Sequence, residues 1–418
     1  MVWESQGAAA ANGSGTVAGM HEARAYATVV LITAGAGVAA IALTRVTRRI
    51  PVPAPALFLL AAALASDVFP GLRTALSIQT VERIGVAALI VILFDGGLHL
   101  GWRRVRSAAV PILSLGVAGT FTTAALVAAA AHLVLGFSWT TSGLIGAAVA
   151  PTDPAVMFSV LGEREPGGRS GVILKGESGA NDPVGIALMI GMIDLARHPD
   201  ESLLRIAREF TLEMTIGAVI GVVAALASRR ALRIPLPSAP LYPLRALSVA
   251  GMVYGIAGVA GGSGFLAVFI LGLLLDRSEI AHRAEVERFH TTLASLAELV
   301  VFIALGLTVH VAALRHDGLW SSGIVLALML TFVARPLAAG PLLALLRLTN
   351  RERVFIVWGG LRGAVPILLA ALAVVEAAPD ARDVYGIVFV VVAFSVLVQG
   401  STVGAVAERL RLPLRPVD

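Results

Sequence analysis

Long apolar stretches recur along the whole chain, separated by short segments rich in polar residues, glycine or proline. Many of them reach about 20 residues, the length that a helix needs to cross the apolar part of a bilayer. The pattern therefore predicts an all-α polytopic membrane protein. About 13 transmembrane spans are expected, at residues 25–43, 53–70, 79–99, 107–135, 138–161, 170–195, 205–228, 241–260, 263–276, 289–311, 319–346, 353–376 and 384–408.

The composition is that of an integral membrane protein. Of the 418 residues, 57% are hydrophobic and 14% are charged, whereas charged residues make up about a quarter of a typical soluble domain. Residues 1–24 lack a basic start followed by an apolar core, so they are predicted to be a short extracytoplasmic tail. The chain has no cysteine, which excludes disulfides, thiolate metal sites and a cysteine nucleophile.

Arginine is distributed unevenly between the expected loops. Loops that follow odd-numbered spans hold 20 arginines, and the loops of the other side hold 8. The positive-inside rule therefore places the amino terminus outside and a short tail, 409–418, in the cytoplasm. This distribution accounts for the pI near 10.3 without nucleic acid as a partner. The expected location is the cell membrane.

The fifth span contains the polar segment VAPTDPAVMFSVL, residues 149–161. Pro151 and Pro154 lack an amide hydrogen, and a residue before proline is pushed away from helical geometry. The helix should therefore break at Thr152 and Asp153, which leaves carbonyl, hydroxyl and carboxylate oxygens inside the membrane. Such backbone is tolerated at this depth around a protein-lined cavity, and small cations prefer oxygen ligands. A kink that serves packing alone is the alternative.

The sixth span opens with GESGANDPVGIAL, residues 176–188. Ser178 and Asp182 are four apart and share one helix face, and Glu177 and Asn181 share the adjacent one. One face can offer a carboxylate and a hydroxyl to an ion, while the other contacts neighbouring helices. The alternative is a set of satisfied interhelical hydrogen bonds, which for Glu177 requires a positively charged partner.

Two arginines lie within expected spans near helix-breaking residues. Arg362 stands in WGGLRGAVPILLA of span 12, where three glycines and Pro366 weaken the helix, and Arg335 stands in LTFVARPLAAG of span 11. Both are candidate partners for Glu177 and for the free helix ends. A further carboxylate, Asp95, lies in LIVILFDGGLHL of span 3. It either lines a route to the site or is hydrogen-bonded and inert near the membrane interface.

The order of the interrupted spans suggests internal symmetry. Spans 1–6 and 8–13 can be paired as two halves, with span 7 at 205–228 as a connecting helix. Spans 5 and 12 then correspond, and the odd span between the halves inverts one relative to the other. Paired broken helices in inverted repeats are typical of the binding site of a secondary transporter. The expected fold is two inverted six-helix repeats with crossed broken helices, whose ends carry partial charges of opposite sign.

The segments APTDPA, GESGANDP, VARP and GGLRGAVP together resemble the monovalent cation:proton antiporters, specifically the Na⁺/H⁺ exchanger branch with an asparagine–aspartate pair. The likeness extends from span 1 to span 13. It implies a moving, ion-transporting core formed by 107–198 and 319–408, and a dimerisation scaffold formed by 25–100 and 241–314. It also implies a homodimer in the bilayer that exchanges Na⁺, K⁺ or Li⁺ for H⁺ without a cofactor.

The resemblance assigns the ion ligands residue by residue. Asp182 would bind either the cation or the proton. Asp153, Ser178 and the main-chain oxygen of Thr152 would complete the shell around the monovalent cation. Because burial disfavours a bare carboxylate and a bound cation favours it, proton and cation would compete for Asp182. Competition combined with alternating exposure gives coupled antiport.

The resemblance also assigns supporting residues. Asn181 would hold the crossing of the broken helices. It stands before Asp182 where other branches have a second aspartate, which implies electroneutral one-for-one exchange. Glu177 would pair with Arg335, and Arg362 would brace the unwound region. Asp95 stands where the family often has a glutamate that lines the funnel, so its shorter side chain leaves that role open.

Three alternatives to an antiporter follow from the same residues. A cation channel would need a pore filter, and no repeated carbonyl filter sequence is present. An intramembrane aspartyl protease would use two aspartates as an acid–base pair, which the prolines around Asp153 argue against; no enzymatic activity is expected. An organic-anion transporter could use the arginines and helix ends. The sequence does not distinguish Na⁺, Li⁺ and K⁺.

Overall fold

The computed structural model describes most of the chain after the first expected span. The described residues are 35, 38, 52–73, 76–153, 155–161, 164–166, 169–198, 203–275, 280–316, 318–412 and 414–416. The expected tail at 1–24 lies outside them. So does the span expected at 25–43, except for Gly35 and Val38, which are helical.

The chain is predominantly helical. Its first half contains α2 (Ala54–Val68), α3 (Pro70–Arg73), α4 (Ile78–Leu100), α5 (Trp102–Val105), α6 (Ala109–Leu113), α7 (Thr120–Leu135), α8 (Trp139–Val149), α9 (Ala155–Leu161), α10 (Arg169–Arg197) and α11 (Leu203–Ala231). Its second half contains α12 (Leu241–Val259), α13 (Gly264–Leu274), α14 (Arg283–Leu307), α15 (Val311–His316), α16 (Leu319–Met329), α17 (Arg335–Ala344), α18 (Asn350–Trp358), α19 (Ala364–Val375), α20 (Ala381–Phe394) and α21 (Ser401–Arg409).

Three π-helical segments join consecutive helices into longer ones. They are Ser114–Gly119 between α6 and α7, Leu330–Ala334 between α16 and α17, and Ser395–Gly400 between α20 and α21. With these joints, each expected span from the second to the thirteenth coincides with a helix or with an interrupted helix pair. The largest boundary difference is in α14, which begins at Arg283 instead of 289. Two short strands add to the all-α architecture, because β1 (Arg164–Pro166) pairs antiparallel with β2 (Leu414–Pro416).

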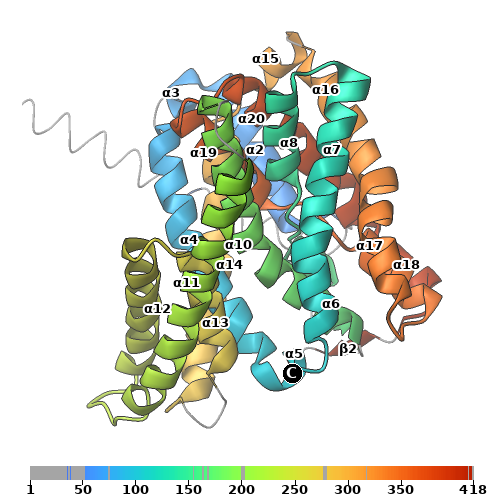
Figure 1. Cartoon of the computed structure of the whole chain (residues 1–418). Coiled ribbons are helices and arrows are strands. Elements are labelled where there is room, and N and C mark those ends of the chain that lie inside the picture. The colour runs from blue at the N-terminus through green and yellow to red at the C-terminus, as the bar shows by residue number, and fades with distance from the viewer. Residues whose placement is uncertain are drawn as a thin grey trace, which may run out of the picture.

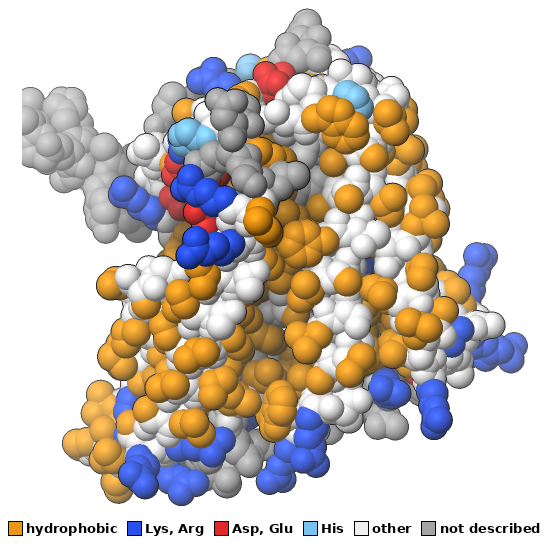
Figure 2. Space-filling view, in the orientation of Figure 1, with side chains coloured by type: hydrophobic (Ala, Val, Ile, Leu, Met, Phe, Trp, Pro, Cys, Tyr) orange, Lys and Arg blue, Asp and Glu red, His pale blue; other side chains and the backbone are white. Residues whose placement is uncertain are grey.

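The helices run between two ends of the molecule. In Figure 1, α3 and α15 lie at the upper end, and α5, β2 and the carboxyl terminus lie at the lower end. Five helices among the described residues are long and apolar enough to cross a membrane: Ala109–Leu135, Leu204–Ala231, Arg283–Leu307, Leu319–Ala344 and Ala381–Arg409. Figure 2 shows hydrophobic side chains over the middle of the face in view, and arginine and lysine side chains at both ends, with more of them at the lower end. This distribution fits a protein surrounded by lipid.

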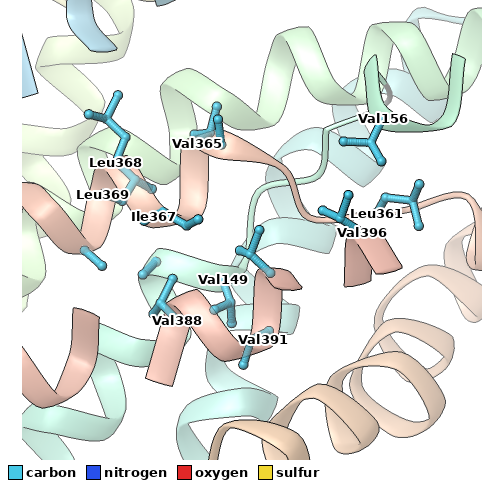
Figure 3. Packing of buried hydrophobic residues seen from close by; sticks show 14 of the residues in the cluster. Val149, Val156, Leu361, Val365, Ile367, Leu368, Leu369, Val388, Val391 and Val396 are labelled. Atoms are coloured by element: carbon cyan, nitrogen blue, oxygen red, sulfur yellow. The ribbon is translucent and has the colours of Figure 1, made fainter. Parts of the chain in front are cut away.

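The largest buried cluster surrounds the two interrupted helix pairs. Val149 and Val156 flank the first interruption, and they belong to the same cluster as Leu361 and Val391. Figure 3 shows Val156 beside Leu361, and Val149 beside Val391 of α20. Apolar packing therefore fixes the segments from which the polar groups of the interruptions project.

Helices α4 and α13 approach each other closely through glycine. A Cβ atom added at Gly97 of α4 would lie 2.6 Å from the carbonyl oxygen of Phe269, and one added at Gly272 of α13 would lie 2.6 Å from that of Phe94. Small residues allow helix backbones to come this close inside membranes. By contrast, a Cβ at the neighbouring Gly96 would meet no atom within 4 Å.

This contact predicts a difference between two adjacent substitutions. Gly97→Ala should force α4 and α13 apart and lower the free energy of unfolding by about 1–3 kcal/mol. Gly96→Ala should be neutral or stabilising, because alanine is favoured over glycine in a helix by about 1 kcal/mol. Thermal unfolding in detergent should therefore give the lowest Tm for Gly97→Ala, and equal Tm values for the two variants would contradict this packing.

Candidate functional site

The two helix interruptions lie against each other. The first separates α8, which ends at Val149, from α9, and the second separates α18 from α19, which begins at Ala364. The amide nitrogen of Asp153 donates a hydrogen bond of 2.8 Å to the carbonyl oxygen of Leu361. Main-chain groups freed by the breaks of spans 5 and 12 thus bind one another, although more than 200 residues separate them.

Arg362 binds the free end of α8. Its Nε donates to the carbonyl oxygen of Val149 at 2.7 Å, and its Nη1 donates to that of Gly360 at 2.6 Å. The side chain is 1% exposed. Since the carboxyl end of a helix carries partial negative charge, a guanidinium stabilises this end of α8. Arg362 was a candidate partner for Glu177 and for a free helix end, and in the structure it binds the helix end.

Two residues that sequence reasoning missed hold the loop around Arg362. The amide nitrogen of Arg362 donates to Ser395 Oγ at 2.9 Å, and that hydroxyl donates to Gln399 Oε1 at 2.9 Å. Both side chains are buried and lie in the π-helical segment that follows α20. Their signal in the sequence is a pair of polar residues, four apart, in the apolar thirteenth span.

Helix α10 places its polar residues beside the first interruption. Asn181 Nδ2 donates to the hydroxyl oxygen of Thr152 at 2.7 Å, so Asn181 joins α10 to the break. Ser178 lies one turn before Asp182, and both are buried, with 8% and 4% of their surface exposed. The carboxylate of Asp182 interacts electrostatically with that of Asp153. The structure thus brings together the four expected ion ligands.

Asp182 carries an oxygen that can accept a ligand. Its Oδ1 is buried and has no hydrogen-bond partner among the described residues, and the same holds for Oδ1 of Asn181. Buried carboxylate oxygens are normally satisfied, because burial without a partner is costly. A proton or a monovalent cation can satisfy Asp182 at this position. The donor set, which consists only of oxygen atoms, suits such a cation.

Glu177 is held by Arg335. Arg335 Nη1 lies 2.5 Å from Glu177 Oε1 and Nη2 lies 2.9 Å from Oε2, a bidentate pair. The side chain of Glu177 is 1% exposed and that of Arg335 is 4% exposed. Arg335 begins α17 directly after the π-helical segment Leu330–Ala334. Glu177 therefore has a charged partner that Asp182, its neighbour on α10, does not have among the described residues.

Asp95 belongs to a different group of contacts. Its Oδ1 lies 3.2 Å from His99 Nδ1 and accepts a 3.2 Å hydrogen bond from Thr291 of α14. These contacts join α4 to α14. They place Asp95 in a cluster with His99 and Thr291, and they give it no bond to the expected ion ligands.

Glu298 is a carboxylate near the site that sequence reasoning missed. It lies on α14, interacts electrostatically with Asp153, and has a buried Oε1 without a hydrogen-bond partner among the described residues. The signal was present in the sequence, since Glu298 is a lone acid in the apolar tenth span. It adds negative charge to the surroundings of Asp153 and Asp182.

The buried pair of Glu177 and Arg335 predicts a strong asymmetry between single and double substitutions. Arg335→Gln should lower the free energy of unfolding by about 3–5 kcal/mol, because it leaves the Glu177 carboxylate buried and unpaired. The double variant Glu177→Gln, Arg335→Gln should be less destabilised than Arg335→Gln alone. As a control, Arg205→Gln removes a pair with Glu209 whose side chains are 57% and 52% exposed, and should cost less than about 1 kcal/mol. Unfolding measured in detergent tests this order, and equal losses in all three variants would contradict it.

Known proteins match this chain over most of its length. The K(+)/H(+) antiporter NhaP of Alkalimonas amylolytica is 34% identical over 375 residues, which cover 88% of this chain and 64% of that protein. The K(+)/H(+) antiporter NhaP2 of Shewanella sp. (strain ANA-3) is 30% identical over 389 residues, which cover 92% of this chain and 67% of that protein. This chain thus spans about two thirds of the length of these relatives.

A solved structure has the same fold. The sodium proton antiporter MjNhaP1 from Methanocaldococcus jannaschii superimposes with a TM-score of 0.75, at 21% sequence identity, over 89% of this chain and 99% of that one. The family described as sodium/hydrogen exchanger, transmembrane, matches residues 36–409. With paired helix interruptions, a buried acidic site and this match across nearly the whole chain, the protein belongs to the sodium/hydrogen exchanger family.

Proposed function

We propose that this protein exchanges a monovalent cation for a proton across the cell membrane, and that the two compete for Asp182. The observation that carries the proposal is the buried carboxylate of Asp182, whose Oδ1 has no hydrogen-bond partner among the described residues, beside two helix interruptions that bind each other. The names of the two relatives above, both K(+)/H(+) antiporters, agree with it. No cofactor is needed.

The cation would be bound by oxygen atoms from α10 and the first interruption. Asp182 and Ser178 supply a carboxylate and a hydroxyl from one face of α10, and Asp153 supplies a second carboxylate. The main-chain oxygen of Thr152 would be the ligand from that residue, while its hydroxyl accepts a hydrogen bond from the amide of Asn181. Fixed oxygens replace part of the hydration shell that the cation leaves in water.

Coupling follows from the cost of moving an empty, charged site. With neither ligand bound, the Asp182 carboxylate would cross the membrane as an unpaired buried charge, which is strongly unfavourable. Either a proton or a cation removes that penalty, and only one of them binds at a time. Alternating exposure of the site to the two sides then exchanges one for the other.

The domain arrangement is also part of the proposal. Residues 107–198 and 319–408 would form the moving core, and 25–100 and 241–314 the scaffold, with the connecting helix at 205–228. Two π-helical segments, Ser114–Gly119 and Leu330–Ala334, support the inverted pairing of the halves. They lie in the fourth and eleventh spans, which hold the same place in the two halves. Span 5 and span 12 correspond in the same way, and both are interrupted. A homodimer and 13 crossings complete this arrangement.

The lower end of the molecule would face the cytoplasm. More arginine and lysine side chains lie there than at the upper end in Figure 2, and the arginine-rich loops are those that follow odd-numbered spans. The carboxyl terminus lies at this end in Figure 1, so with 13 crossings the amino terminus would lie outside. K⁺ is the first cation to test, because the relatives at 34% and 30% identity are named for it, with Na⁺ and Li⁺ beside it.

Substitution of Asp182 tests the exchange directly. In liposomes with an acidic interior and an internal pH dye, adding K⁺, Na⁺ or Li⁺ outside should alkalinise the interior. Asp182→Asn should abolish this response, because an amide cannot exchange a proton for a cation. Asp383→Asn, a matched change at an exposed position of α20, should keep it.

Two outcomes would contradict the proposal. Cation-dependent proton flux that persists in a folded Asp182→Asn protein would exclude this residue as the shared site. Absence of a response to all three cations in the folded wild type would favour an organic anion as substrate, and unitary currents would favour a channel.

Electroneutrality gives a separate prediction. Asn181 stands beside Asp182 where a second carboxylate would add charge to the moving site, so one cation should exchange for one proton. The exchange rate at fixed ion gradients should then be unchanged when a membrane potential is imposed on the liposomes. A rate that rises with one sign of potential and falls with the other would show net charge movement and refute one-for-one exchange.

A further inference from the structure

The hydroxyl group of Tyr385 joins α20 to the carboxyl end of α14. It lies 2.5 Å from Thr308 Oγ1 and 3.4 Å from the carbonyl oxygen of Leu305. Thr308 donates its own hydroxyl proton to that carbonyl oxygen at 2.8 Å, so Tyr385 is the donor in the bond to Thr308. Tyr385 is 7% exposed, and it is the only polar residue between Asp383 and Ser395. The bond therefore satisfies a hydroxyl group that is buried among apolar side chains.

Thr308 is fixed to helices that are assigned above to the scaffold. Ser66 of α2, which is fully buried, donates to the carbonyl oxygen of Val309 at 2.9 Å. The carboxylate of Asp67, the next residue along α2, accepts a 2.9 Å hydrogen bond from the amide of Ala312 in α15. These two bonds hold the segment that contains Thr308 against α2, so the acceptor of the tyrosine bond would move with the scaffold.

Tyr385 belongs to a core helix that reaches the ion site. At the end where Tyr385 lies, α20 is held to α8 by Thr141, whose hydroxyl donates to Asp380 at 2.6 Å. Directly after α20, Ser395 accepts a 2.9 Å hydrogen bond from the amide of Arg362, in the loop of the second interruption. Ser395 follows Tyr385 by 10 residues, or about 15 Å along a helix. Helix α20 thus connects the tyrosine hydroxyl with the main chain beside the ion ligands.

The bond lies at the end of the molecule opposite the arginine-rich loops. Thr308 caps the carboxyl end of α14, and α15, which follows it, lies at the upper end in Figure 1. Helices α15 and α20 approach each other closely there, because a Cβ atom added at Gly386 would lie 2.5 Å from Leu314 Cδ2. Leu314 is 7% exposed. The boundary between the proposed core and scaffold is therefore closed at this end, by apolar contact and by the hydrogen bond from Tyr385.

We propose that Tyr385 and Thr308 form a latch that holds the core on the scaffold at this end, and that the latch opens when the ion site is exposed to the outer solution. The latch rests on the exchange function and on the two domains proposed above. Movement of the core separates the two hydroxyl groups and breaks their bond, so the latch favours the conformation that is closed toward the outside. Its strength then sets the ratio of the cation affinities measured from the two sides.

Removal of one hydroxyl group tests the latch. Tyr385→Phe keeps the ring and deletes the donor, so the ratio of outward-open to closed protein should rise about two- to tenfold, the value of one hydrogen bond. In liposomes, the ratio of the inside KM to the outside KM for the cation should rise by the same factor, because apparent affinity scales with the competent population. Thr308→Val should shift this ratio in the same direction, and the double variant should add little to either change alone. Thr141→Val is the matched control, because it removes a short bond at the same end but within the core, and it should leave the ratio at the wild-type value.

The accessibility of a buried thiol reports on the latch without transport. The chain has no cysteine, so Leu314→Cys supplies a single thiol at the closed boundary. In detergent, this thiol should react with a charged methanethiosulfonate about two- to tenfold faster when Tyr385→Phe is added, because the open population is larger. Addition of Thr141→Val should leave the reaction rate unchanged. Modification is followed by protein mass.

The latch and the proposed function fail in different ways. If the folded wild type shows no exchange, the proposed function fails, and the thiol reaction still decides on the latch. If the wild type exchanges cations, an unchanged KM ratio or an unchanged thiol reaction in Tyr385→Phe overturns the latch, and Thr308→Val decides in its place if Tyr385→Phe does not fold. Equal effects of Thr141→Val overturn it as well, because a loosened core alone would then explain the shift.

Discussion

The main-chain groups freed at the two helix interruptions are bound within the protein, and the geometry of the ion site depends on those bonds. An unsatisfied amide or carbonyl inside the membrane costs several kcal/mol, so an interrupted helix persists there only if protein groups replace its own ladder. The amide of Asp153 binds the carbonyl of Leu361, and Arg362 binds the carbonyl of Val149. With these groups satisfied, Thr152 and Asp153 can stay outside helical geometry and present oxygens toward α10.

The buried charges divide into those that hold the structure and those that can change partner. Glu177 is fixed by two hydrogen bonds from Arg335, and Arg362 donates to the carbonyl oxygen of Val149 at the end of α8 and to that of Gly360 in the second interruption. Asp182 has no cationic partner among the described residues, although it stands five positions from Glu177 on the same helix. A carboxylate that is buried and unpaired favours a mobile positive ligand, and this contrast is why we assign exchange to Asp182 and support to Glu177.

Local sequence rules predicted where the helices break but not what the freed groups bind. Pro151, Pro154 and the glycines around Arg362 were enough to locate both interruptions, and apolar length located the helices from the second span onward. The choice between Arg335 and Arg362 as partner of Glu177 could not be read from spacing alone, because 158 residues separate the bonded pair. Ser395, Gln399 and Glu298 were missed although each is a polar residue in an apolar span. Their importance comes from neighbours that are distant in the sequence.

The central claim is that cation and proton compete for Asp182, and the proton released on cation binding measures this directly. The purified protein, in a weakly buffered and mildly acidic solution with a pH dye, is titrated with K⁺, Na⁺ or Li⁺ while cation binding is followed by calorimetry. The account predicts about one proton released per cation bound, with release lost in Asp182→Asn and kept in Asp383→Asn. Cation binding without proton release in the wild type, or undiminished release in Asp182→Asn, would contradict it.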